Sequence, residues 1–150
     1  MAKFSTGLRN LVALNSGLAE ALSGCVLKLY SGTVPSGSNS AIGSATLLGV
    51  YSGNGVANAG LQFESTPVDG AIIKKASQGR QCPAAVASGN ASFYRLEQPG
   101  DTGAESSTAV RVQGTVGVVN ADLNLTAGVT VTAGAPLQIN TYILSIPEQA

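Results

Sequence analysis

The 150-residue chain contains no histidine and no tryptophan, and it has only two cysteines and one methionine. Without histidine there can be no Ser-His-Asp or Cys-His nucleophile system and no histidine-containing zinc site. Two cysteines are also too few for a four-cysteine zinc cluster. The composition therefore excludes the commonest forms of nucleophilic and zinc catalysis, and we expect a protein that is not an enzyme, with no catalytic residue, metal or cofactor.

Charged residues are scarce as well, at 11% of the chain, against roughly a quarter in an average soluble domain. Eight basic and eight acidic residues cancel, so no global field attracts nucleic acid or anionic lipid. The one adjacent basic pair, Lys74-Lys75, is interpreted as a solvated strand end. We therefore expect no nucleic-acid partner and no membrane partner.

Long hydrophobic runs are missing too. The chain has no stretch of about twenty apolar residues, and its N-terminal residues lack the apolar core of a secretory signal. We expect a protein made in a bacterial cytoplasm. Cys25 and Cys82 are predicted to be buried and reduced, although their spacing alone leaves a disulfide open.

What is present begins with a helical arm, residues 1–24. Its apolar positions recur at helical spacing: Phe4, Leu8, Leu11 and Val12. Ser5 or Thr6 can serve as N-cap, and a second short helix is expected over 18–22, closing at Gly24. Helices this short are not stable alone, so the apolar stripe must dock on its own sheet or on a neighbouring protein. The four stripe residues are therefore the candidate partner-binding residues.

From Cys25 onward the apolar period becomes two, which is typical of strands. Glycine, asparagine and proline separate ten candidate segments, from which we expect about eight or nine strands: 25–30, 45–51, 61–64, 71–75, 91–97, 109–113, 115–119, 121–125, 129–132 and 137–146. The last segment is predicted to be one long central strand, and 77–90 and 98–107 to be long loops. Asp69-Gly70 predicts a tight hairpin turn. The fold class is thus mainly β, an antiparallel β sandwich or jelly roll over residues 25–150 behind the arm.

Charged side chains are expected on the outside of this fold. Val110 and Val112 are predicted to face the core, and Arg111 and Gln113 to face solvent. Three carboxylates gather around one turn: Glu97, Asp101 and Glu105. Two carboxylates suffice for a glycosidase, but a segment so rich in serine, glycine and threonine favours solvated loop charges.

The order of motifs resembles a family of small virion structural proteins encoded by tailed phages, and the resemblance covers nearly the whole chain. The resemblance is carried by Phe4-Ser-Thr-Gly-Leu-Arg-Asn, Ala21-Leu22-Ser-Gly, Leu27-Lys-Leu-Tyr30-Ser-Gly-Thr-Val-Pro-Ser36, Thr46-Leu-Leu48, Ala87-Ser-Gly-Asn-Ala-Ser-Phe93-Tyr-Arg95-Leu, Gly100-Asp101-Thr102-Gly103, Arg111-Val-Gln113-Gly-Thr-Val116-Gly and Ala121-Asp-Leu123-Asn-Leu125. It implies a component of the virion.

Three functions remain open at this point. The first is a capsid decoration or cement protein that binds the major capsid protein or another virion protein and stabilises the head shell. The second is a tail, baseplate or fibre component, and the third is a carbohydrate-binding or hydrolytic module. A homo-oligomer is also expected, because apolar residues occupy both faces of the strands near 94–96 and 144–146.

Overall fold

The computed structural model describes residues 1–14, 17–139 and 141–146. Within these residues, two short helices and eleven strands follow one another: β1 Lys3–Phe4, α1 Thr6–Ala13, α2 Leu18–Ala21, β2 Val26–Ser31, β3 Thr46–Gly53, β4 Ala71–Ile73, β5 Arg80–Cys82, β6 Gly89–Glu97, β7 Arg111–Gly117, β8 Leu123–Asn124, β9 Thr130–Val131, β10 Leu137–Ile139 and β11 Ile143–Ser145. The fold class is mainly β with antiparallel sheets and short N-terminal helices, as the sequence predicts.

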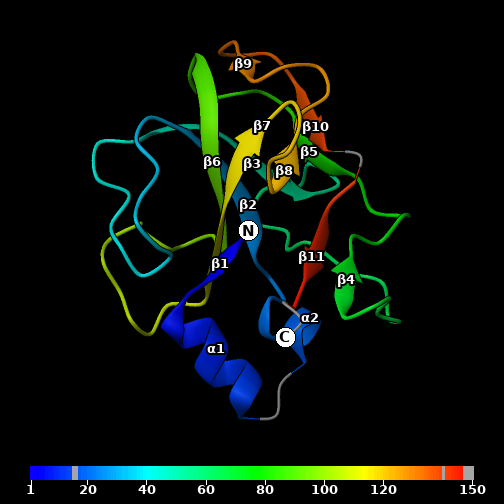
Figure 1. Ribbon diagram of the computed structural model, residues 1–150. Helices are drawn as coiled ribbons and strands as arrows, with labels where there is room; N and C mark the ends of the chain where they lie inside the picture. Colours follow the sequence, from blue (N-terminus) through cyan, green and yellow to red (C-terminus); the bar gives the residue numbers. More distant parts are fainter. Residues whose placement is uncertain (15–16, 140, 147–150) are drawn as a thin grey trace.

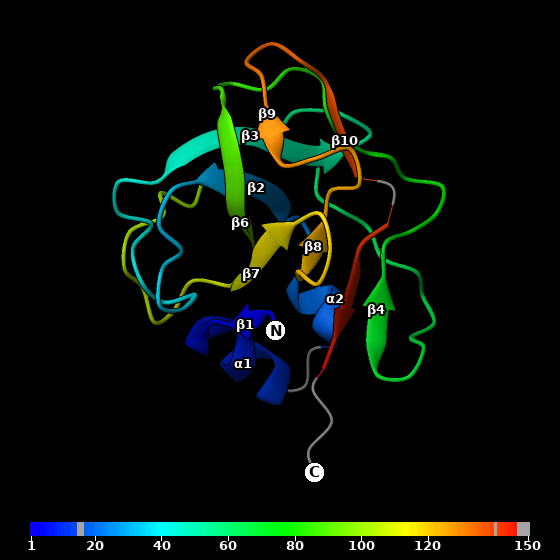
Figure 2. The ribbon, with the colours of Figure 1, turned by 45° about the horizontal axis from the view of Figure 1, so that its top comes forward.

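One large sheet organises the molecule, with strand order β1-β7-β6-β2-β3-β5-β10. All neighbours along this path are antiparallel, whereas β8 pairs with β7 in parallel and β9 pairs with the start of β6. A separate two-stranded sheet joins β4 to β11. Figures 1 and 2 show this small sheet beside the large one, with α1 and α2 near its end.

The core lies against the face of the large sheet that carries the alternate side chains of β2, such as Leu27 and Leu29. Residues from both helices and from both sheets join it, including Leu8, Leu22 and Leu144, and all of these are at most 2% exposed. The two helices of the arm therefore share one hydrophobic core with the strands.

The structure contains the turns that short sequence motifs predict. The Asp69-Gly70 turn forms as predicted: both residues have positive φ, at 49° and 71°, and Val68 and Ala71 exchange two backbone hydrogen bonds across it. Gly24, with φ of 80°, follows α2 as expected for a left-handed helix end. Cys25 and Cys82 are both free and buried in the structure.

The prediction for the last strand is wrong. Residues 137–146 do not form one central strand, because, in the part of the chain that the structure describes, β10 pairs with β5 and β11 with β4, in two different sheets. The predicted strands 109–113 and 115–119 are instead one strand, β7, and the predicted loop 77–90 contains β5. Apolar alternation marks strands but does not reveal with which distant strand each one pairs.

Candidate partner-binding surface

The predicted arm stripe is already docked on its own chain. Phe4 belongs to β1, which pairs with β7, while Leu8, Leu11 and Val12 lie on α1. Leu8 is completely buried, and the other three are partly buried against the core. Of the two docking possibilities raised by the sequence, the structure contains the intramolecular one. Any contact with a neighbour would use the exposed parts of Phe4, Leu11 and Val12, and that role stays a prediction.

Ser5 is the residue that joins the arm to the sheet. Its Oγ accepts a hydrogen bond from the Leu8 N–H at 3.1 Å, which makes it the N-cap of α1. The same Oγ accepts from the Arg111 N–H at 2.9 Å and donates to the Ala109 carbonyl at 2.8 Å. The Ser5 N–H also donates to the Arg111 carbonyl, which continues the pairing of β1 with β7. One buried hydroxyl therefore fixes both the start of the helix and its position on β7.

A loop that we call the strap, residues 35–40, holds the arm from the other side. The Asn39 amide pairs with Thr6 twice: Oδ1 accepts from the Thr6 N–H at 2.9 Å, and Nδ2 donates to the Thr6 hydroxyl at 2.7 Å. The Lys3 ammonium donates to the Ser36 carbonyl, and the Ser38 hydroxyl donates to the Lys3 carbonyl. The arm, the strap and β7 thus form one hydrogen-bonded assembly.

Beneath the strap, the second face of β2, β6 and β7 carries buried charges. The Glu97 carboxylate lies 3.0 Å from the Lys28 ammonium and 3.7 Å from Arg111 Nε. Arg111 in turn makes a two-point ion pair with Asp101, with both nitrogen–oxygen distances at 2.6 Å. Lys28 also donates to the Asp101 carbonyl at 2.8 Å. These contacts fix the 98–107 loop, which carries Asp101, to the sheet.

Arg95 and Gln113 occupy the adjacent row of the same face. Arg95 Nε donates to Gln113 Oε1 at 3.0 Å, and its Nη2 donates to the Ser40 carbonyl at 2.6 Å. Gln113 Nε2 donates to the Pro35 carbonyl at 2.8 Å. Arg95 is completely buried, and within the described residues its Nη1 has no hydrogen-bond partner. This row therefore holds the strap down through neutral carbonyl oxygens.

Burial raises the pKa values of Glu97 and Asp101, whereas their cationic partners lower them. Burial raises the pKa of Glu97, and the nearby Lys28 ammonium offsets this only in part. For Asp101, burial also opposes ionisation, but the hydrogen bonds from Arg111 and the Gly103 N–H, together with the cationic charges, outweigh it and lower the pKa. Burial raises the pKa of the Cys25 thiol to about 12, so this thiol is unreactive at neutral pH.

Several predictions about charged and polar side chains are wrong, because side chains expected in solvent are buried. Arg111 and Gln113, expected to face solvent, are each only 2% exposed, and Glu97, expected to be a solvated loop charge, is completely buried. Lys74 is buried too, with its ammonium donating to the Gln78 carbonyl. The period-two pattern assigned Arg111 and Gln113 to the correct face of β7. No signal in the sequence shows that two loops cover that face.

The layer has the chemistry of a structural network. Its carboxylates come close together, as in a hydrolase, but each is held by a cation and faces a loop. Proton transfer to a substrate needs an acid or base within hydrogen-bonding reach of that substrate. Within the described residues, no group of three or more histidine, cysteine or acidic side chains could hold a metal ion.

The outer surface carries large apolar side chains scattered over strand ends and turns. Those more than 40% exposed are Met1, Leu14, Val34, Val56, Val68, Val86, Val118, Val119, Ile143 and Ile146. Val118 and Val119 form the turn between β7 and β8, close to Asp122, whose carboxylate binds the Met1 ammonium at 3.1 Å. Ile143 and Ile146 lie on and just after β11. The 94–96 segment, in contrast, is buried in the chain itself. In the described residues, no helix is long and apolar enough to cross a membrane.

These features define a mainly β protein in which several charged side chains are buried and paired. Its surface carries neutral polar side chains and exposed aliphatic ones. No protein-family model, curated protein or solved structure matches the chain.

Proposed function

We propose that the chain is a structural component of a tailed-phage virion, and specifically a capsid decoration or cement protein that stabilises the head shell. The observation that carries the proposal is the nature of its surface. Among the residues whose burial the structure describes, five charged side chains are buried: Lys28, Lys74, Arg95, Glu97 and Arg111. What remains outside is poor in charge and dotted with exposed aliphatic side chains, which suits packing against many neighbours.

The resemblance in motif order supports the same proposal. Several of its motifs correspond to parts of the fold described above: the arm with Ser5, the strand with Lys28, and the β7 segment with Arg111 and Gln113. The arm and β7 both bond to the strap, and Lys28 joins Arg111 through Glu97, so the motifs mark residues that hold one assembly together. A rigid domain with fixed loops is what a cementing protein must present to a regular lattice.

The mechanism we propose is attachment by shape and apolar contact to the major capsid protein or another virion protein. Each contact is weak, but a homo-oligomer engages several sites of the repeated lattice at once, which raises the overall affinity. A second copy of the chain is an additional partner, with the exposed Ile143 and Ile146, on and just after β11, as the contact.

The location is tested on virions of the phage or prophage that encodes the chain. Reconstruction of the particle should place the protein on the head shell. Density on the tail, baseplate or fibre would support the alternative structural role, and absence of the protein from purified particles would contradict both.

Rebinding to particles that lack the protein tests the mechanism. Binding should change less than about twofold between low and moderate salt, because attachment does not depend on opposite charges. Leu14, at the end of α1, is 79% exposed and provides a probe of the arm. The Leu14→Ser variant should fold normally and bind less tightly if the arm contacts the shell, with Val86→Ser as the matched control far along the chain. Loss of binding on adding moderate salt would contradict the apolar mechanism.

A further inference from the structure

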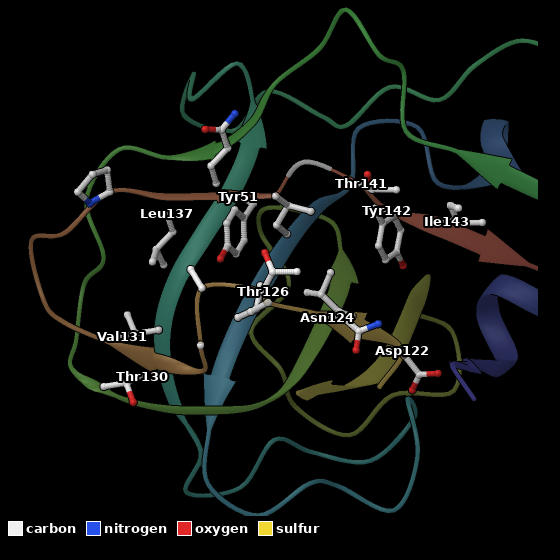
Figure 3. Close-up of a pocket in the computed structure, with 17 residues that line it drawn as sticks. Tyr51, Asp122, Asn124, Thr126, Thr130, Val131, Leu137, Thr141, Tyr142 and Ile143 are labelled. Carbon is white, nitrogen blue, oxygen red and sulfur yellow. The ribbon is translucent and has the colours of Figure 1, made fainter. Parts of the chain in front are cut away.

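A cavity of about 550 Å³ lies between β8, β10 and the start of β11, and the mechanism proposed above does not use it. It is bounded by β8, by the segment from β8 to β9, by β10 and by the start of β11. Figure 3 shows side chains from these segments arranged around one hollow, with Tyr51 of β3 and Tyr142 at its sides. Its volume is within the range of about 300–1,000 Å³ that small-molecule sites occupy.

The rim of this cavity carries hydrogen-bonding groups that the fold leaves available. Thr126, Gln138 and Thr141 line it, are exposed, and make no side-chain hydrogen bond within the described part of the chain. Asn124 uses its Oδ1 to accept from the Ala121 N–H, which leaves its Nδ2 donors available. Hydroxyl and amide groups both donate and accept, so the rim can bind a ligand that does the same.

The floor of the cavity is apolar. Leu123 and Val131 are 2% and 3% exposed, and both line it together with Leu137. Tyr51 and Tyr142 also line the cavity, and the Tyr142 hydroxyl lies 3.1 Å from that of Tyr94. A ligand that fits must therefore combine an apolar face with several hydroxyl groups.

The charge of the lining further restricts which ligands can bind. No lysine or arginine is among the described residues that line the cavity, so an anionic ligand would meet no countercharge. Asp122 is the one carboxylate there, and it already binds the Met1 ammonium at 3.1 Å and the Thr115 N–H at 2.9 Å. The lining thus favours a neutral ligand.

We propose that this cavity binds a neutral saccharide. A sugar ring presents hydroxyl groups at its edge and C–H groups on its face, which match the threonine, asparagine and glutamine rim and the apolar floor. This binding activity goes beyond the proposed role in the shell and does not depend on it. It also gives a location to the carbohydrate-binding function that the sequence left open.

The test uses the full chain and a panel of neutral sugars: glucose, galactose, N-acetylglucosamine, maltose and lactose. Saturation-transfer NMR at sugar concentrations up to about 10 mM should detect at least one ligand, since millimolar dissociation constants are expected for a small neutral sugar. Failure of every sugar in the panel to bind would overturn the proposal.

Variants then locate the site. Thr126→Val and Thr141→Val keep the side-chain shape and remove one hydroxyl each, so each should weaken binding about fivefold. Thr102→Val, an exposed threonine outside the cavity, should leave the affinity unchanged. Binding that is insensitive to both cavity variants would also overturn the proposal. Both variants should still attach to particles, so failure of sugar binding and failure of the shell role are separate results.

Discussion

The central strands β2, β6 and β7 have two buried faces of opposite chemistry. One carries Leu27, Leu96 and Val112 and packs in the main core, whereas the other carries Lys28, Glu97 and Arg111 and is covered by loops. Apolar burial is non-directional, but a buried charge is tolerated only when its partner is correctly placed. The apolar face therefore stabilises the domain, and the charged face determines where the strap and the 98–107 loop must lie.

The largest effect should come from removing the central cation of the charged face. Arg111→Met leaves both Glu97 and Asp101 without their shared partner, and we expect the free energy of unfolding to fall by about 3–5 kcal/mol. Urea denaturation measures this. Arg9→Met, on the exposed side of α1, should change the stability by no more than about 0.5 kcal/mol. A loss below about 1 kcal/mol for Arg111→Met would mean that the charged face is not needed for folding.

A double-mutant cycle sharpens the comparison. Lys28→Met or Glu97→Leu alone leaves a charge without its nearest partner, whereas the double variant replaces the pair by apolar groups. We expect the double variant to be more stable than the sum of the single effects predicts, by about 0.5–3 kcal/mol. Additive effects would show that the two charges do not interact energetically.

A smaller effect is expected where the arm meets β7. Ser5→Ala removes the N-cap and two further hydrogen bonds of a side chain that is 1% exposed, so the expected cost is about 2 kcal/mol. Thermal denaturation measures it, with the exposed Ser44→Ala as the control. Equal stability of the two variants would contradict the role assigned to Ser5.

The dependence on pH should be the mildest effect. Because the pKa of Asp101 is lowered by folding, its contribution is present above its ordinary value of 3.8 and is lost as the pH falls below it. The pKa of Glu97 is raised, so its protonation favours the folded state as the pH falls toward its ordinary value of 4.5. Stability should therefore be level or rise slightly down to about pH 4.5 and then decrease.

Asp101→Asn provides the matched variant for this profile. It should reduce the decrease below about pH 4, although Asp122, whose pKa is also lowered, keeps part of it. Equilibrium unfolding at several pH values measures the profile. If the stability of the variant falls below about pH 4 as much as that of the unmodified chain, Asp101 does not cause the decrease.

Local chemistry explains which parts of the fold could be predicted. The Ser5 cap, the Asp69-Gly70 turn and the period of β2 are each determined by residues that are neighbours in sequence, and all three appear in the structure. β5, Arg80–Cys82, was missed because it has no apolar alternation. It is a strand because β3 and β10 pair with it from far along the chain.

The candidate site was harder to predict for the same reason. Arg111 meets Glu97 and Asp101, which the sequence places near one another, but the strap that covers them comes from residues 35–40. Burial of a charged strand face depends on such distant loops. The cavity between β8 and β10 likewise brings together segments whose threonines and asparagine look like ordinary surface residues in the sequence.

The hydrogen bonds of Ser5 also have a consequence for the order of events on the ribosome. Ser5 is bonded to Arg111, 106 positions later in the chain. At about 5–20 residues per second, synthesis reaches β7 roughly 5–20 s after the arm has been made. During that interval the apolar stripe of the arm has no β7 on which to dock. The residues of α1 therefore stay undocked from β7 through most of the synthesis of the chain.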